Sequence, residues 1–355
     1  MTDVVEQNLM QRFHYLENPD AGSIASTAEG FLQQLQRPTC LFFQGRDTTR
    51  TRAVVTLLHG NEPSGFRALH RWIKSGRQPA VNIVCVIASV EAALQEPVFS
   101  NRVLPEKRDL NRCFRQPFDI DTQGQLADDI LQLLQHYQTE AVVDIHNTSG
   151  SGPSFGVAIY VDDKHDALTS LFTQRLIVTD LRLGSLMEIS EHLFPTVTIE
   201  CGGRLDDEAH EIAWEGINRY FMADDVLKPQ ATEWGLEVLH NPVRLELTES
   251  CRISYAEGPQ ADADLTLKPD IEHHNFGVVA GQTFLGWVNT NNLRQIFVAK
   301  NKAQQCVLDE LVMIRDGQLL TKQPLKLFMI TTNPAIAKMD CLFYAVKSDG
   351  QEIVV

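Results

Sequence analysis

Long hydrophobic runs are missing from this chain of 355 residues, and no apolar segment approaches the ~20 residues that a membrane-spanning helix needs. The first twenty residues lack a basic start followed by an apolar core, so we expect no export signal. The 7 Cys are scattered without close pairs, which argues against a disulfide framework. These absences favour a protein of the reducing cytoplasm that has no membrane partner.

Positive charge is also scarce, because the formal net charge is −15. The chain has no basic stripe with interleaved aromatic residues, so nucleic acid is excluded as an expected partner. Hydrophobic residues make up 43% and charged residues 22% of the chain, as in ordinary globular proteins. An acidic protein must hold any anionic small substrate with local arginines.

Apolar segments alternate with helical ones in the first part of the chain. Residues 53–58 form an apolar, β-branched run, residues 66–74 have helical spacing, and residues 81–88 form a second apolar run. This order predicts two buried parallel strands joined by a right-handed crossover. We therefore predict an α/β fold with a mixed, mainly parallel central sheet flanked by helices and a smaller β-rich C-terminal domain.

The same reasoning predicts further elements and a domain boundary. We expect a catalytic domain over residues 1–228, with a preface at 1–38, and a β-rich domain over 229–355. The predicted elements comprise helices at 28–35, 125–137, 165–179 and 206–222, strands at 141–145, 155–161 and 195–199, and a short edge strand at 40–43 that pairs with 53–58.

Polar residues stand where three of the predicted strands end. His59 and Glu62 follow the first strand, His146 follows the strand at 141–145, and Glu200 follows the strand at 195–199. Open α/β sheets carry their reactive groups beyond the carboxyl ends of the strands. Two His and one carboxylate are the ligand set of a catalytic zinc site, and a further carboxylate can serve as general base. The pattern predicts one Zn²⁺ per chain, held by His59, Glu62 and His146, with Glu200 as the base.

Each of these residues taken alone has a simpler explanation. A single His is more often a hydrogen-bonded histidine than a ligand, and Glu62 by itself suits the first turn of a helix. The metal hypothesis depends on all four groups following buried strands. Asp144, two residues before His146, either faces the opposite way or supports His146 from behind.

A cluster of arginines lies in the irregular, proline-containing segment 89–121, which also contains Asp109 and Asn111. The arginines are Arg102, Arg108, Arg112 and Arg115. Long irregular segments in compact domains are commonly functional loops, which favours a binding role for these arginines. A solvated basic loop is the alternative.

These motifs together resemble the succinylglutamate desuccinylase/aspartoacylase family of zinc-dependent deacylases, whose fold is related to that of zinc carboxypeptidases. The matching stretches are HGNE at 59–62, DLNR followed by CF at 109–114, DIHNT at 144–148 and TIECG at 198–202. The resemblance covers about residues 50–222. It implies His59, Glu62 and His146 as zinc ligands, Glu200 as general base, and Asn111 with Arg112 as the pair that binds a substrate carboxylate.

The chain departs from the family at two positions. The family's carbonyl-polarising Arg lies five residues before the DLNR aspartate, where this chain has Leu104, so Arg102 or Arg108 would have to replace it. Aspartoacylases also carry an Arg ten residues before the catalytic Glu, where this chain has Ser190. The second departure disfavours acetylaspartate as the substrate.

We therefore predict a zinc-dependent amidohydrolase that cleaves a small N-acyl amino acid by metal-activated water, with Glu200 as general base. The alternatives are a zinc carboxypeptidase that acts on peptides and a non-catalytic binding protein that retains the fold. The sequence leaves open the acyl group, the amino acid, the native metal and whether the chain forms a homo-oligomer.

Overall fold

The computed structural model describes residues 12–228, 235–339, 341–351 and 353. The chain divides into two compact units. Unit 1 comprises Met1–Asn147, Ser154–Leu176 and Arg182–Leu236, and unit 2 comprises Thr148–Pro153, Ile177–Leu181 and Glu237–Val355. Residues 1–11 of the predicted preface and the first residues after the predicted boundary, 229–234, lie outside the described residues.

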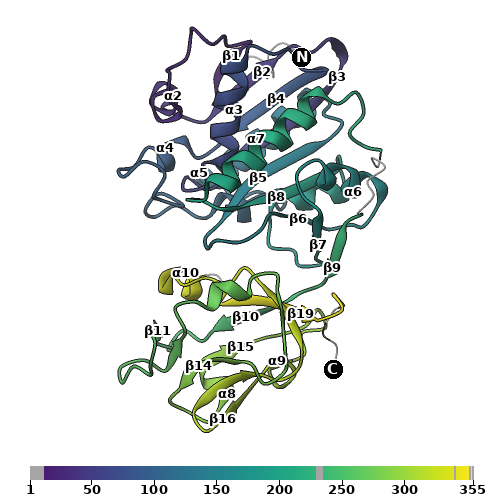
Figure 1. Cartoon of the computed structure of the whole chain (residues 1–355). Helices are drawn as coiled ribbons and strands as arrows, with labels where there is room; N and C mark the ends of the chain where they lie inside the picture. The colour runs from purple at the N-terminus through teal and green to yellow at the C-terminus, as the bar shows by residue number, and fades with distance from the viewer. Residues whose placement is uncertain (1–11, 229–234, 340, 352, 354–355) are drawn as a thin grey trace. The chain divides into compact units, whose positions relative to one another are not determined.

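The described strands of the first sheet form a nine-stranded order, β1-β2-β4-β3-β5-β8-β6-β7-β9 (Figure 1). Their bounds are β1 His14–Glu17, β2 Thr39–Phe43, β3 Asp47–Thr56, β4 Val81–Ile87, β5 Val142–Thr148, β6 Phe155–Ala158, β7 Arg175–Val178, β8 Thr196–Gly203 and β9 Glu237–His240. The pairs β3–β4 and β3–β5 are parallel, whereas β2–β4 and β6–β8 are antiparallel.

Helices cover both faces of the sheet, so its central strands are buried on both sides, as their continuous apolar runs predict. On one side α3 and α7 lie next to each other (Figure 1), and Trp72 meets Phe221 edge to face at 4.9 Å. On the other side α5 packs its apolar stripe on alternate residues of the strands. The helices of unit 1 are α2 Ala28–Leu35, α3 Ser64–Ser75, α4 Val90–Ala93, α5 Thr122–His136, α6 Asp163–Ser170 and α7 Asp207–Met222, with 3₁₀ turns η1 Leu110–Arg112 and η2 Leu186–Glu191.

Unit 2 is β-rich, and its described strands form two five-stranded sheets with orders β13-β18-β19-β10-β15 and β11-β12-β14-β17-β16. The strands are β10 Val243–Leu247, β11 Ile253–Tyr255, β12 Leu265–Leu267, β13 Val278–Val279, β14 Phe284–Val288, β15 Phe297–Val298, β16 Val312–Arg315, β17 Gln318–Thr321, β18 Leu325–Phe328 and β19 Phe343–Lys347. The helical segments are η3 Ile271–His274, α8 Leu293–Ile296, α9 Leu308–Leu311 and α10 Pro334–Met339. The predicted fold class, an α/β unit with a mainly parallel sheet and a smaller β-rich C-terminal region, is confirmed.

Two predicted elements were wrong in detail. The strand at 40–43 pairs with β4 and β1 rather than with β3, and it is not at the edge. The segment between β2 and β3 passes over the start of β4 at Gly45. A Cβ at Gly45 would lie 2.1 Å from the Val81 carbonyl carbon, so this crossing requires glycine. The predicted helix at 165–179 ends at Ser170, and β7 occupies its second half because Arg175–Val178 is rich in strand-forming residues.

Cys306 is exposed, and the other six cysteines are buried. Within the described ranges, no helix is both long enough and apolar enough to pass through a bilayer.

Candidate metal centre

The turn after β3 brings His59 and Glu62 to the edge of the sheet. Leu57 has φ +53°, so the chain leaves the strand direction immediately, and the Glu62 amide donates to the His59 carbonyl at 3.2 Å. Gly60 lies between them, where a Cβ would come within 2.7 Å of the Asn101 carbonyl oxygen. Its own amide donates to the Arg102 carbonyl at 2.9 Å. This close approach, which glycine permits, places the Arg102 segment beside the two polar residues.

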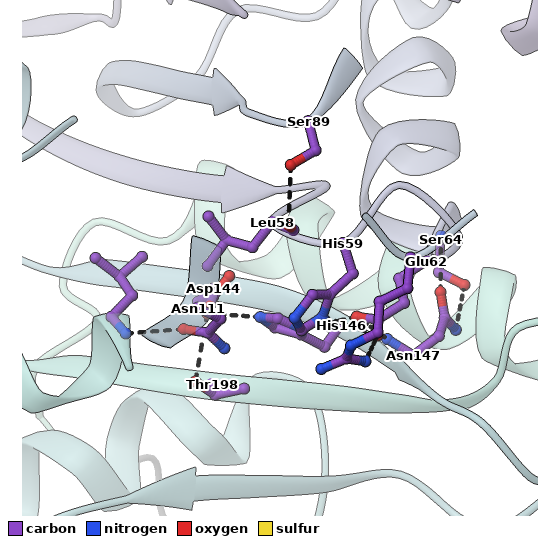
Figure 2. A network of polar contacts seen from close by, with 12 residues as sticks. Leu58, His59, Glu62, Ser64, Ser89, Asn111, Asp144, His146, Asn147 and Thr198 are labelled. Carbon is purple, nitrogen blue, oxygen red and sulfur yellow. Dashed lines mark hydrogen bonds and ion pairs between the residues drawn. The ribbon is translucent and has the colours of Figure 1, made fainter. Parts of the chain in front are cut away.

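His59, Glu62 and His146 converge in a buried cluster (Figure 2). One ligand atom from each residue lies within 4.8 Å of the others. The Nδ1 atom of His59 is 2.9 Å from Glu62 Oε1, and the Nδ1 atom of His146 is 2.7 Å from Glu62 Oε2. The two imidazole nitrogens therefore face one carboxylate, the arrangement in which a cation can replace the protons between them.

A carboxylate stands behind each histidine. The Nε2 atom of His59 is 2.8 Å from Asp109 Oδ1, and the Nε2 atom of His146 is 2.7 Å from Asp144 Oδ2. Each carboxylate accepts the Nε2 hydrogen, which leaves the Nδ1 lone pairs for a metal. Two imidazoles and a carboxylate, with a further carboxylate hydrogen-bonded to each imidazole, could hold a metal ion.

Asp144 resolves an alternative that the sequence left open. Residues two apart on a strand point to the same face, so Asp144 and His146 lie on one side of β5. The idea that Asp144 faces away from His146 was wrong, and its contact with His146 supports the second alternative.

The charges in the cluster depend on one another. Burial by itself lowers the pKa of His59, but the negative charge of Glu62 and the hydrogen bonds to Asp109 and Glu62 together outweigh it, so the pKa is raised. Burial likewise opposes protonation of His146, yet the charges of Asp144 and Glu62 raise its pKa well above its usual value. For Glu62, burial raises the pKa, but the charges and hydrogen bonds of the two histidines lower it by more, so that the pKa lies well below its usual range. The two histidines therefore hold a proton more tightly than free imidazoles do, and Glu62 keeps its charge more readily than a free carboxylate does.

Arg102 belongs to the cluster, whereas Arg108 does not contact it. The Arg102 guanidinium donates to Glu62 Oε1 at 3.1 Å and to Asp109 Oδ2 at 3.0 Å. Arg108 pairs instead with Asp119 at 2.9 Å and with Asp121 at 2.6 Å. It lines a hollow of about 420 Å³ whose other walls include Lys107, Ile120 and Thr122.

Glu200 lies within β8 rather than after its end, so strand alternation decides where its side chain points. Thr198, two residues earlier, donates to Asp144 Oδ2 at 3.4 Å, which puts this face of β8 toward the cluster. The Glu200 Oε2 atom is buried without a hydrogen-bond partner in the described part of the chain. Burial, followed by the negative charge of Glu62, raises the pKa of Glu200 to about 7, although the positive charge of His146 opposes the shift. An unpartnered carboxylate beside a metal cluster suits a group that exchanges protons.

Asn111 and Arg112 form a turn of fixed orientation. The Asn111 Oδ1 atom accepts from the Leu186 amide at 2.9 Å, so its amide nitrogen is the end left to donate. Arg112 Nη1 donates to the Asn111 carbonyl at 2.8 Å. Across the described residues, the half-buried Arg112 forms no ion pair with a carboxylate. Two donors side by side suit a carboxylate ligand.

Sequence reasoning assigned no role to Asp109 or to Asn147. Asp109 caps η1 by accepting from the Asn111 amide at 2.9 Å while it supports His59. Asn147 donates its backbone N–H to Glu62 Oε2 at 3.3 Å. Both residues lie next to motif residues, which could have drawn attention to them. Their partners lie far away along the chain, so the sequence does not show what they contact.

Comparison with known proteins finds a family model that matches part of the chain. Residues 49–213 match the model of the succinylglutamate desuccinylase/aspartoacylase catalytic domain. A search of curated proteins finds no match.

Solved structures share the fold at low sequence identity. Succinylglutamate desuccinylase from Vibrio parahaemolyticus is 13% identical, with a TM-score of 0.54 over 91% of this chain and 95% of that chain. The succinylglutamate desuccinylase/aspartoacylase of Rhodobacter sphaeroides is 15% identical, with a TM-score of 0.53 over 84% of each chain. Succinylglutamate desuccinylase from Chromobacterium violaceum is 12% identical, with a TM-score of 0.53 over 87% of this chain and 88% of that chain.

Proposed function

Because residues 49–213 match the model of the succinylglutamate desuccinylase/aspartoacylase catalytic domain, we propose that this protein is a zinc-dependent hydrolase that cleaves the amide bond of a small N-acyl amino acid. The observation that carries the proposal is the buried cluster of His59, Glu62 and His146, with Asp109 and Asp144 behind the two histidines. A divalent cation would take the place of the protons between the two imidazoles and Glu62.

His59 and His146 would hold zinc through Nδ1, and Glu62 through its carboxylate. Bound zinc supplies Lewis acidity toward a carbonyl oxygen and lowers the pKa of a water molecule. Glu200 accepts the proton of the attacking water and passes it to the leaving nitrogen. Positive charge at the cluster favours the ionised Glu200 that this role requires.

Arg102 polarises the scissile carbonyl, the role of the family Arg whose position is occupied here by Leu104. Its guanidinium already lies at Glu62 and Asp109, so it can stabilise negative charge that develops on the acyl oxygen. Asn111 and Arg112 bind the carboxylate of the amino acid, because guanidinium and amide donors form two parallel hydrogen bonds to it.

A hydrolysis screen tests this function. The zinc-loaded protein is offered acetyl, succinyl and longer acyl derivatives of the common amino acids, with dipeptides for comparison. We expect turnover of at least one acyl amino acid, and faster cleavage of dipeptides would indicate a peptidase instead. Zinc binding without any turnover would contradict the hydrolase.

Glu200→Gln provides the matched control for this screen. The substitution keeps the size of the side chain and removes its proton-accepting charge. Turnover should fall by ~10²-fold or more, with zinc content, measured by elemental analysis, unchanged. Retained turnover would remove Glu200 from the mechanism.

A further inference from the structure

A chain of hydrogen bonds, buried at its inner end and partly buried at its outer end, connects the proposed metal cluster with a histidine on α7. Asn147 Oδ1 accepts from the Ser64 amide at 3.0 Å, and Asn147 Nδ2 contacts Ser64 Oγ at 2.8 Å and the Gly202 carbonyl at 3.0 Å. Ser64 Oγ is in turn 2.7 Å from His210 Nδ1. We call Asn147, Ser64 and His210 the relay. Figure 2 shows its first two members, Asn147 and Ser64, beside Glu62.

The direction of each bond follows from the donors and acceptors available. A backbone N–H only donates, so the Asn147 atom that faces the Ser64 amide is the oxygen, and its NH₂ group gives hydrogens to Ser64 Oγ and to Gly202. Ser64 Oγ therefore accepts from Asn147 and has its own hydrogen to give. His210 Nδ1 takes that hydrogen, which requires a neutral imidazole with its proton on Nε2.

Protonation of His210 conflicts with this arrangement. A protonated ring turns Nδ1 into a donor, so Ser64 Oγ would accept twice and its own hydrogen would lose its acceptor. Ser64 is completely buried, so water cannot replace that acceptor. The relay is satisfied only while His210 is neutral.

The surroundings of His210 favour the neutral form. Burial lowers its pKa first, and the positive charge of Arg67 on α3 lowers it further. Three carboxylates near the start of α7 act in the opposite direction: Asp207, Asp206 and Glu211. Glu211 is itself paired with Arg71 of α3 at 2.7 Å. Among the strands that α7 contacts, β4 has no charged side chain and β8 has only Glu200.

Two catalytic elements depend on the inner end of the relay. The Asn147 backbone N–H reaches Glu62 Oε2, and the Asn147 side chain holds Gly202, two residues after Glu200 on β8. We propose that His210, acting through Ser64 and Asn147, is a positioning residue for the metal ligand Glu62 and for the end of β8 that carries Glu200, and that proton uptake by His210 releases this support. The inference rests on the proposed function, because it assumes that Glu62 holds the metal.

Zinc affinity as a function of pH tests the relay without a substrate. Competition with a chromophoric chelator gives the zinc Kd of the full-length chain between pH 5.5 and 8. His210→Asn places an amide oxygen near the position of Nδ1, so it accepts from Ser64 at every pH. We expect wild type and His210→Asn to have the same zinc Kd near pH 8. At pH 5.5 wild type should bind zinc about 10-fold more weakly than His210→Asn, which is the lower end of the effect of groups that orient metal ligands.

Two further variants separate the relay from other effects of pH. His136→Asn, at an exposed position in the last turn of α5, should follow wild type. Ser64→Ala breaks the relay while His210 still titrates, so His210→Asn should make no difference in that background. Parallel wild-type and His210→Asn profiles would overturn the inference. A difference that persists in Ser64→Ala would also overturn it, because it would mean that charge acts through space.

The tautomer of His210 gives a readout that needs no metal. In ¹⁵N NMR spectra of the metal-free chain at pH 8, Nδ1 of His210 should be unprotonated, and a hydrogen on Nδ1 would refute the relay. A wild-type chain that binds no zinc at any pH would count against the proposed function, and the relay would then be decided by the tautomer.

Discussion

Arg102 and Arg108 are similar in sequence context but differ in the acids that they neutralise. Arg102 contacts Glu62 and Asp109, both of which touch a histidine of the cluster. Arg108 is held by Asp119 and Asp121, which touch no residue of the cluster in the described chain. A charge that is already paired at a distance from the reacting atoms cannot stabilise them, so we propose Arg102, and not Arg108, for the acyl oxygen.

The pair provides a matched test at the residue scale. Arg102→Gln should lower kcat by ~10²-fold, as for loss of a donor to a developing oxyanion. Its zinc affinity should be retained or increased, because Arg102 opposes positive charge at His59. Arg108→Gln should change kcat by no more than about 2-fold, as expected of an exposed ion pair.

Steady-state kinetics and chelator competition measure both quantities. Equal losses of kcat in the two variants would contradict the assignment. So would a loss of zinc from Arg102→Gln large enough to explain its lower activity.

At the scale of elements, prediction succeeded where an apolar run alone decides the structure. The strands β3 and β4 and the helix α3 between them follow from the hydrophobic pattern, and α3 ends at Gly76. It failed where a tertiary contact decides. The crossing at Gly45 moved β2 to the far side of β4, and no local pattern near Gly45 shows which strand it must pass.

The candidate site shows the same division. His59, Glu62 and His146 could be found because each motif follows a strand, and parallel strands end at one edge. Asp109 and Asn147 could not, because their roles depend on partners 50 and 85 residues away in sequence. Glu200 was predicted as the base from its motif, whereas its position inside β8 was not predicted.

A turn between elements offers a further test. Gly184 has φ +80°, and a Cβ there would lie 2.6 Å from the Arg112 carbonyl oxygen. Its carbonyl accepts from the Phe114 amide at 2.9 Å, so this loop supports the Asn111 and Arg112 turn. Gly184→Ala should displace Arg112 and raise KM by about 10-fold, equivalent to about 1.4 kcal/mol, with a smaller effect on kcat.

Gly76→Ala is the control for backbone strain. Gly76 has φ +62° and no atom within 4 Å of a built Cβ, so alanine there meets strain alone. Gly76→Ala should lower the free energy of unfolding by about 1–2 kcal/mol and leave KM unchanged. If both variants raise KM alike in steady-state assays, the effect comes from general destabilisation and the loop has no role in binding.

At the scale of the whole molecule, the proposed ligands lie in a single compact unit. His59, Glu62 and His146 all fall within the Met1–Asn147 part of unit 1, on segments that meet only when β3 and β5 pair. A metal bound there stabilises the folded form of unit 1. None of the three proposed ligands belongs to unit 2. Metal binding should therefore raise the free energy of unfolding of unit 1 and leave that of unit 2 unchanged.

Hydrogen exchange measured with and without zinc checks this division. Zinc at 1,000 times its Kd stabilises a folded unit by about 4 kcal/mol, so the slowest amides of β3, β4 and β5 should exchange up to ~10³-fold more slowly. Amides of β14 and β17 in unit 2 should keep their rates. His146→Asn, which removes one ligand, should abolish the zinc effect in unit 1. Equal protection of both units would mean that they unfold together, and no protection in either would mean that zinc does not bind the folded cluster.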